Sequence, residues 1–452
     1  MKKNQAAIGN PLRIGRAGIF AILVLLVALP GLASAGTVYV APAGRDSNSG
    51  TMARPVQTIA RAVELAVPGD TIYLRGGRYD VDHFIFINKP ELTVVSYPGE
   101  YARVVGPVDD QRLIAIFVIV ASHVSLLNME IQGGAYYGVK VDVEHDLPAQ
   151  GVAIRNCRIH DTGHDCIKTF DADGLVIEDC EIGPSGLLDP SNAEGIDSIG
   201  SVGVTIRRCY IHDSATNGLY LKGGARDGLI ESCRIERTHG FSGILLGQDT
   251  DSGFMRDGAK YEAINCTARN NIVAHTGAAG LGTYSGFNVR FENNTLYDVA
   301  SQIQAGFWVV TNTRHVPAEH VSFVNNIVVI QSGRPFTFVK DLGGQLIAES
   351  NIYYGPGGAY EFRHESSALV QRWSFADWKK GMNVDEHSAV ANPLLDTGHL
   401  YRPLPGSPAI GRGVVLSGVT SDYAGSTRPA GAGCDIGAFQ VSCARGVCPQ
   451  GL

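Results

Sequence analysis

A short phrase that recurs through the chain sets the main constraint on its fold. Each copy alternates apolar and polar residues, passes through Cys or Asn and ends on an apolar residue, and this alternation with period two predicts β-strands. The clearest copies stand at 124–131, 152–159, 176–182, 204–211 and 229–235. The shortest interval between equivalent positions is 180 − 157 = 23 residues, which is the length of one coil of a β-solenoid. No long helical pattern lies between the copies, so the strands are expected to stack into parallel sheets around one core.

One position of the repeat predicts two ladders inside that core. Cys157, Cys180, Cys209 and Cys233 occupy it first, and Asn271, Asn294, Asn326 and Asn351 occupy it later, where amides can hydrogen-bond along the stack. The cysteine spacing follows the coil and not the short Cys-x-x-Cys pattern of a metal site, which disfavours bound zinc. Nine cysteines cannot all pair, and the tail offers one plausible local pair, Cys443 with Cys448, for which Cys434 could compete.

The amino-terminal 35 residues predict a secretory signal. Basic residues at positions 2, 3, 13 and 16 precede an apolar run over 19–29, and Ala33 and Ala35 offer a cleavage site. A membrane anchor is the alternative, but the run is too short to span a bilayer of about 30 Å. Cleavage would leave 452 − 35 = 417 residues with a net charge of −7 − 4 = −11. We therefore expect a secreted or periplasmic protein that leaves the membrane after signal cleavage.

Composition narrows the class of partner. Hydrophobic residues make up 44% of the chain and charged residues 18%, which excludes a disordered protein. A mildly acidic chain without a basic block gives no reason to expect nucleic acid. An acidic glycan stays compatible with this charge, because one local basic cluster is enough to bind it. We expect a monomer.

The ends of the chain predict caps. Ile59, Ala62, Val63 and Ala66 recur at helical spacing, which predicts a short amphipathic helix that covers the first coil and protects its edge. Residues 374–380 predict a second small helix near the far end.

Several segments resemble secreted bacterial right-handed parallel β-helix proteins. The opening segments are 38–51, 55–63 and 68–79, and the closing ones, which resemble the last coils of those proteins, are 377–394, 405–411 and 434–439. The resemblance implies an all-β, single-stranded right-handed parallel β-helix with a short N-terminal capping helix, in one domain from 36 to 452. The group includes polysaccharide lyases, epimerases, glycoside hydrolases and proteins with no known reaction, so fold alone does not give the activity.

Strand parity gives a map of the outer surface. In the strands near 139, 167, 196 and 219, one outward position reads Lys140, Lys168, Asp197 and Tyr220, and another reads Tyr137, Asp165, Glu194 and Asn217. Adjacent coils lie about 4.8 Å apart. Asp165, Glu194 and Asp197 are therefore expected in one patch, flanked by Lys140, Lys168 and Lys222. Lys140 beside Lys168 should lower the pKa of both amines, because each disfavours charge on the other.

This patch resembles the site of calcium-dependent pectate lyases that use a lysine base. The resemblance implies that Asp165, Glu194 and Asp197 bind Ca²⁺, with Lys222 as the base and Lys168 as the second candidate. The chain differs from those enzymes in lacking an adjacent Asp-Asp pair in these coils. A lyase of this kind removes the C5 proton of a uronate and breaks the bond to the leaving oxygen by β-elimination.

The expected function is a polysaccharide lyase acting on a uronate-containing, pectate- or alginate-like glycan. Residues expected to contact this acidic polysaccharide are Lys140, Asn217, Tyr220, Tyr284 and Trp308. Asp249 and Asp251 lie in a glycine-bounded loop beside the expected groove, and the sequence predicts only a turn there. Three alternatives stay open: a glycoside hydrolase that uses the same carboxylates, a uronan epimerase, and a non-catalytic exported glycan-binding protein.

Overall fold

The computed structural model describes residues 35–441, except 144–146, 359–360, 367–368 and 432. The described residues from Gly36 onward belong to one compact unit. The predicted signal segment, apart from Ala35, lies outside the described residues, and so do Cys443 and Cys448. No helix within the described ranges is long and apolar enough to cross a bilayer.

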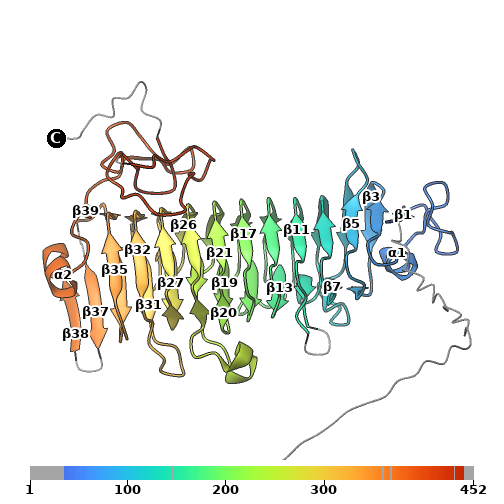
Figure 1. The fold of residues 1–452 in the computed structure, drawn as a ribbon, viewed down its shortest axis with the longest axis horizontal. Coiled ribbons are helices and arrows are strands. Elements are labelled where there is room, and N and C mark those ends of the chain that lie inside the picture. Colours follow the sequence, from blue (N-terminus) through green and yellow to red (C-terminus); the bar gives the residue numbers. More distant parts are fainter. Residues whose placement is uncertain (1–34, 144–146, 359–360, 367–368, 432, 442–452) are drawn as a thin grey trace, which may run out of the picture. The chain divides into compact units, whose positions relative to one another are not determined.

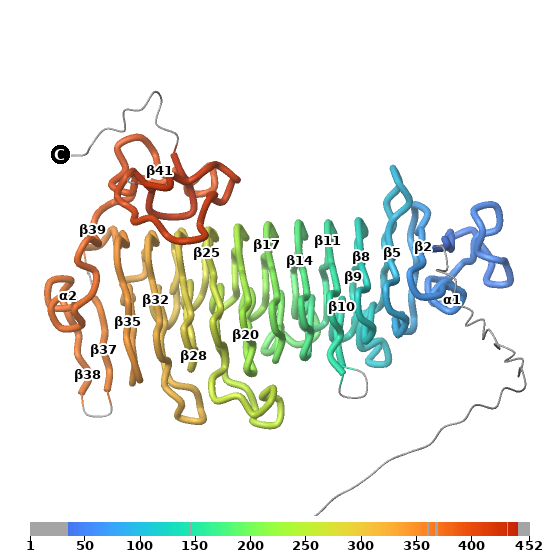
Figure 2. Tube along the Cα trace, viewed as in Figure 1, coloured from blue at the N-terminus to red at the C-terminus, as the bar shows by residue number. Residues whose placement is uncertain are grey.

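Three twelve-stranded sheets run the length of the stack, and successive strands of the chain pass from one sheet to the next (Figures 1 and 2). Sheet 1 contains β1 (Thr37–Val40), β2 (Thr71–Leu74), β5 (Thr93–Ser96), β8 (Ser125–Leu127), β11 (Ala153–Arg155), β14 (Val176–Glu178), β17 (Thr205–Arg207), β21 (Leu229–Glu231), β25 (Thr267–Arg269), β29 (Arg290–Glu292), β32 (Val321–Val324) and β35 (Leu346–Glu349).

Sheet 2 contains β4 (Ile85–Ile87), β7 (Ala115–Ile119), β10 (Tyr137–Val141), β13 (Ile167–Phe170), β16 (Ile196–Ile199), β19 (Leu219–Lys222), β23 (Ile244–Leu246), β27 (Leu281–Tyr284), β31 (Phe307–Val310), β34 (Thr337–Lys340), β37 (Phe362–Ser366) and β38 (Leu369–Trp373). Sheet 3 contains β3 (Gly77–Asp80), β6 (Ala102–Val105), β9 (Met129–Gln132), β12 (Arg158–His160), β15 (Glu181–Ile182), β18 (Tyr210–His212), β22 (Arg234–Thr238), β26 (Ile272–Thr276), β30 (Thr295–Tyr297), β33 (Ile327–Val329), β36 (Ile352–Tyr354) and β39 (Ala389–Val390).

The strand pairs within these sheets are parallel, except the last pair of sheet 2, β37 with β38. A small sheet of β20 (Ala225–Arg226), β24 (Ala263–Ile264) and β28 (Gly286–Phe287) lies in the loops, and β40 (Leu395–Asp396) pairs with β41 (Arg402–Pro403). The predicted right-handed parallel β-helix is confirmed.

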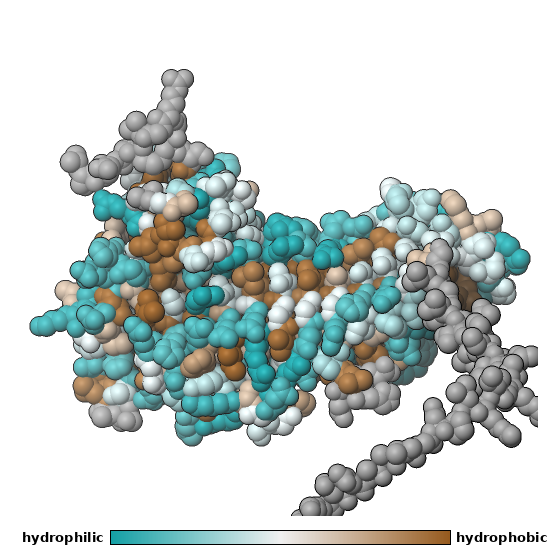
Figure 3. All heavy atoms as spheres, in the orientation of Figure 1, coloured by the Kyte–Doolittle hydropathy of each residue, from teal (hydrophilic) through white to brown (hydrophobic). Residues whose placement is uncertain are grey.

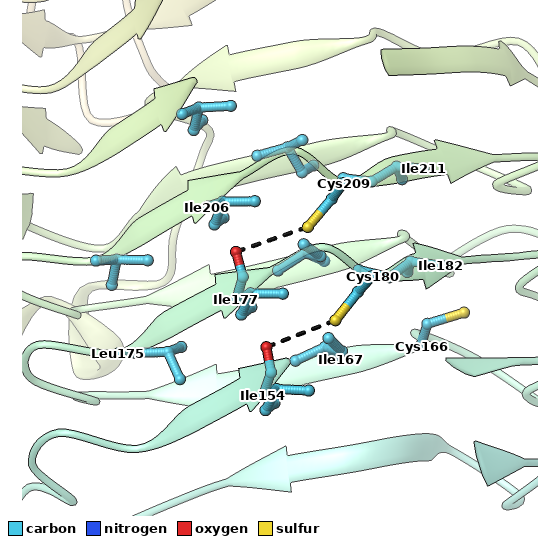
Figure 4. Close-up of a cluster of buried hydrophobic side chains, with 14 of the residues drawn as sticks. Ile154, Cys166, Ile167, Leu175, Ile177, Cys180, Ile182, Ile206, Cys209 and Ile211 are labelled. Carbon is cyan, nitrogen blue, oxygen red and sulfur yellow. Dashed lines mark hydrogen bonds between the residues drawn. The ribbon is translucent and has the colours of Figure 1, made fainter. Parts of the chain in front are cut away.

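The two predicted ladders fill the core beside the turn between sheets 1 and 3. The residue before each cysteine takes a left-handed conformation, as Asp179 does with φ 55° and Arg208 with φ 52°, and this single residue turns the chain. Cys180 Sγ then donates to the carbonyl of Ile154, and Cys209 Sγ donates to that of Ile177 (Figure 4). The cysteine ladder is therefore a packing element of the core.

The asparagine ladder continues the same slot with stronger hydrogen bonds. Asn294 Oδ1 accepts from the backbone N–H of Asn271 at 2.9 Å and from its side-chain amide at 3.0 Å. In the same way, Asn326 Oδ1 accepts from both N–H groups of Asn294, and Asn351 Oδ1 accepts from both of Asn326. These amides satisfy buried backbone groups at the turns, as predicted.

Both predicted caps are present. Helix α1 (Ile59–Leu65) begins after Thr58, whose side chain accepts from Arg61 N, and it buries Ile59, Ala62 and Val63 against the first coils. Helix α2 (Phe375–Met382) buries Trp378, whose ring stacks on Phe362 with 5.3 Å between centroids. Two short 3₁₀ turns, Ser252–Phe254 and Arg256–Gly258, lie in the long loop after β23.

The carboxyl-terminal segment differs from the prediction that its sequence forms last coils. After β39, which still pairs with β36, residues 392–431 and 433–441 form loops and the short β40–β41 pair, and they fold back onto the outer face of sheet 3. Ile436 and Ala409 pack there on Ile327 and Ile352, while Phe439 packs near Ile272. The apolar residues of 405–411 and 434–439 therefore cover a sheet from outside.

Candidate active site

The outer face of sheet 2 brings the predicted residues together in register. Lys140 on β10 lies opposite Lys168 on β13, which lies opposite Asp197 on β16, and Asp197 lies opposite Tyr220 on β19. Asp165 and Glu194 stand two residues before β13 and β16. Residues separated by one coil of sequence are thus neighbours in space, as the repeat predicted.

Asp165, Glu194 and Asp197 form what we call the carboxylate cluster. One oxygen from each lies within 4.8 Å of the others, and the three residues are only 3%, 4% and 2% exposed. The backbone N–H of Glu194 donates to Asp165 Oδ1 at 2.9 Å. Burial, followed by the negative charges of Glu194 and Asp197, raises the pKa of Asp165 well above its usual range. The cluster therefore holds three acidic groups out of contact with water, and their repulsion favours the protonated form of Asp165.

Two oxygens of the carboxylate cluster have no hydrogen-bond partner among the described residues. They are Glu194 Oε2 and Asp197 Oδ1, whereas Glu194 Oε1 accepts from Thr216 at 2.7 Å and from Asn217 at 3.2 Å. A buried acceptor without a donor is costly and rare. Carboxylate oxygens are the ligands that hard cations such as Ca²⁺ prefer. The three residues therefore fit a calcium ion.

Lys168 is tied to the carboxylate cluster. Its amine forms an ion pair with Asp197 and lies 3.7 Å from Asp165 Oδ2. Burial acts to lower the pKa of Lys168, but the charges of Asp197 and Asp165 outweigh burial and the pKa is raised. The prediction that Lys140 lowers the pKa of Lys168 is therefore wrong. The Lys140 amine lies 2.5 Å from Asp142 Oδ2 and is paired there.

Lys222 lies beside the carboxylate cluster without a close ion pair. Its Nζ is 4.0 Å from Asp197 Oδ2, donates to Tyr220 Oη at 3.1 Å and sits 4.3 Å from the centre of the Tyr220 ring. Tyr220 itself is buried, with 3% of its surface exposed. Of the two predicted lysine bases, Lys222 is the one whose amine is not engaged directly by a carboxylate.

A pocket of about 290 Å³ opens next to these groups. Five predicted residues line it: Glu194, Asn217, Tyr220, Lys222 and Tyr284. The sequence did not point to five of the others that line it, Ser191, Asn192, Thr216, Phe241 and Gln248, and it predicted only a turn at the sixth, Asp249. These six belong to loops or strand approaches, whose paths strand parity cannot give. A larger pocket of about 850 Å³ lies between β35 and α2, at the carboxyl-terminal end of the stack.

Two predicted substrate contacts lie apart from this pocket. Lys140 belongs to the coil before Lys168 and pairs with Asp142. Trp308, on β31, stacks on Phe338 with 4.3 Å between ring centroids, and its buried Nε1 has no hydrogen-bond partner in the described structure. Along the middle of the stack, the face seen in Figure 3 is largely hydrophilic with scattered hydrophobic residues.

The chain is similar in sequence to two right-handed β-helix family models and in structure to a pectate lyase. A family model described as "Right handed beta helix region" matches residues 147–328, and one described as "Pel9A-like, right handed beta helix region" matches 38–181. The crystal structure of pectate lyase Pel9A superposes with a TM-score of 0.60 over 91% of this chain and 98% of that one, at 15% identity. At 15% identity this structural likeness supports the shared fold alone and does not establish the activity.

Two curated proteins match parts of the chain. Pectate lyase PEL9 of Emericella nidulans is 47% identical over 55 residues, which are 12% of this chain and 13% of that protein. The uncharacterized protein YwoF of Bacillus subtilis is 26% identical over 291 residues, or 59% of this chain and 57% of YwoF. The chain thus spans little more than half of one relative and a small part of the other. The predicted resemblance to right-handed β-helix proteins of the pectate lyase type is confirmed.

Proposed function

We propose that this protein is a polysaccharide lyase that cleaves a uronate-containing, pectate- or alginate-like glycan by β-elimination. The observation that carries the proposal is the carboxylate cluster, buried with two unpartnered oxygens beside a pocket that Lys222 also lines. The likeness to PEL9 and Pel9A, both pectate lyases, supports it. Export to the periplasm or the medium is part of the proposal and rests on residues 1–35.

The roles of the residues follow from their positions. Asp165, Glu194 and Asp197 would hold Ca²⁺, which when bound neutralises the carboxylate of a uronate and makes its C5 proton more acidic. Lys222, in its neutral form, takes the C5 proton. The electron pair forms the C4–C5 double bond, the C4–O bond breaks, and the departing oxygen takes up a proton. Lys168 stays protonated and holds Asp197 and Asp165 in place.

The direct test is incubation of the protein with pectate and with alginate. A lyase releases an unsaturated uronide that absorbs ultraviolet light, and a chelator should abolish the signal until calcium is restored. Lys222→Met should lower the rate by about 10²–10⁴-fold, the usual contribution of a general base. Lys340→Met is the matched control, because Lys340 lies on the same sheet but pairs with Glu365 at 2.8 Å, away from the pocket.

The same incubation separates the alternatives. A glycoside hydrolase produces reducing ends without the ultraviolet absorbance, an epimerase changes the proton resonances of an uncut polymer, and a binding protein does neither. The separation of the carboxylates disfavours an inverting hydrolase, because one oxygen from each lies within 4.8 Å of the others, whereas inversion uses about 6.5–9.5 Å to admit a water. Production of reducing ends alone would overturn the lyase proposal.

A further inference from the structure

On β23, β27 and β31, the three strands that follow Lys222, the described outer face of sheet 2 carries no positive charge to match a second uronate. Toward the carboxyl terminus the outward residues are uncharged on three successive strands: Leu245 on β23, Gly282 and Tyr284 on β27, and Trp308 and Val310 on β31. The next lysine or arginine in register among the described residues of this sheet is Lys340 on β34, which Glu365 neutralises. These coils therefore present neutral and aromatic surface.

Cations in the neighbouring loops are also engaged. Arg314 donates to Glu262 Oε1 at 3.0 Å and to two backbone carbonyls, and Lys260 pairs with Glu319 at 3.3 Å. Arg334 donates to the carbonyl of Gln302, and it does not line the pocket. Lys222 is thus the one cationic side chain among the residues that line the pocket.

The part of the pocket on this side combines aromatic and polar side chains. Phe241 is 42% exposed, and the hydroxyl of Tyr284 accepts from Gln304 Nε2 at 3.1 Å, which fixes its ring. Gln248 offers an amide, and Asp249 offers a carboxylate whose Oδ1 accepts from Thr313 N at 2.6 Å. Sugar rings stack on aromatic faces and their hydroxyls donate to carboxylates, but a uronate here would meet the negative charge of Asp249.

We propose that this side of the pocket, formed by Phe241, Gln248, Asp249 and Tyr284, is a subsite for an uncharged sugar, and that Asp249 determines this specificity. The inference rests on the proposed function, since it takes the cleaved residue to be a uronate bound at the carboxylate cluster. The substrate is then a glycan in which that uronate is flanked by a neutral sugar or by an esterified uronate. A fully charged homopolyuronate is the disfavoured substrate, because the repulsive carboxylate acts against it.

The test compares three sets of oligosaccharides of equal length: fully de-esterified homopolyuronates, their methyl esters, and oligomers in which uronates alternate with neutral sugars. Both kcat/KM and the binding constant in calcium are measured. We expect the charged homopolymer to be the poorest ligand and substrate by at least about tenfold. Preference for the methyl ester or for the alternating oligomer tells which uncharged neighbour is used, and either result supports the subsite.

Asp249→Asn sharpens the test, because asparagine keeps an acceptor for Thr313 N, removes the charge and replaces the other oxygen by an amide NH2. It should improve kcat/KM and binding of the homopolyuronate by about fivefold, the effect of one partly exposed charge, and it should weaken binding of the uncharged-neighbour substrates, whose hydroxyls lose a charged acceptor. Asp251→Asn is the matched control, since Asp251 is an exposed acid of the same loop outside the pocket, and it should leave both unchanged.

The two proposals fail in different ways. If the wild-type protein binds and cleaves the homopolyuronate as well as the other sets, the subsite is wrong and the lyase stands. If no unsaturated product forms but binding still favours uncharged neighbours in an Asp249-dependent manner, the lyase is wrong and the subsite stands.

Discussion

Sheets 1 and 2 each stack charged side chains along their outer faces. On sheet 1 charges of opposite sign pair with one another, whereas on sheet 2 charges of the same sign cluster. On sheet 1 the signs alternate from coil to coil in what we call the charge ladder: Arg155, Glu178, Arg207, Glu231, Arg269 and Glu292. Glu178 receives hydrogen bonds from Arg155, Arg207 and Arg208. Hydrogen bonding from Arg207, then from Arg155 and Arg208, outweighs burial and lowers the pKa of Glu178 to about 2.

On sheet 2 three carboxylates meet with one amine, Lys168, in close contact. Unlike charges that alternate along a sheet stabilise its strand pairing, whereas like charges buried side by side oppose folding. The side chains of the charge ladder pair with one another, whereas the carboxylate cluster leaves Glu194 Oε2 and Asp197 Oδ1 without a hydrogen-bond partner among the described residues. Unpaired oxygens, more than the number of charges, distinguish a binding site from a structural array on such a surface.

The largest effect is expected from removing a charge in the carboxylate cluster. Asp197→Asn keeps the size of the side chain but removes the charge that pairs with Lys168 and lies 4.0 Å from Lys222, so lyase activity should fall by at least about 100-fold. Glu231→Gln makes the equivalent change in the charge ladder and should leave activity unaltered. Equal losses in the two variants, measured by ultraviolet absorbance, would remove the distinction between the arrays.

Calcium should stabilise the protein through the carboxylate cluster. At a calcium concentration 100-fold above Kd, the gain in unfolding free energy is about 2.7 kcal/mol if the unfolded chain binds none. Differential scanning calorimetry should show a higher Tm for the wild type in calcium and a much smaller shift for Glu194→Gln, which retains the hydrogen bonds from Thr216 and Asn217. A full shift in that variant would place the ion elsewhere.

Glu178→Gln should cost stability rather than activity. Three arginines donate to a carboxylate that is buried, but their own side chains are almost half exposed, so we expect a loss of about 1–2 kcal/mol at pH 7. The folded-state pKa is depressed, so this stabilisation is present above the unfolded-state pKa of about 4.3 and is lost as the pH falls toward about 2. Denaturation of both proteins at pH 7 and pH 3 checks whether their difference shrinks.

Much of the fold and the meeting of the carboxylates could be predicted from sequence because the repeat specifies neighbours. Once the period is known, Asp165, Glu194 and Asp197 must lie on adjacent coils, and strand parity turns Asp197 outward. Both ladders and both helical caps follow from similar local patterns.

Side-chain pairing and loop paths could not be obtained in this way. Lys140 has several rotamers within reach of different partners, and it pairs with Asp142 on its own coil instead of acting on Lys168. Asp249 and Phe241 reach the pocket through turns whose geometry depends on distant anchors such as Thr313. The closing segment 405–439 shows the same limit, because its apolar pattern suits either an inner coil or an outer cover.

The carboxyl-terminal segment that covers sheet 3 changes how the molecule can unfold. In a solenoid each coil touches only its neighbours, so coils can unravel one after another from an end. The described residues between 392 and 441 instead join distant coils: Arg428 donates to Asn270 Oδ1, and the Asn325 amide donates to the carbonyl of Val414. The segment packs across β26, β30, β33 and β36, so we expect the coils that contain these strands to unfold together as one cooperative unit. During folding, the segment can dock only after those coils have formed.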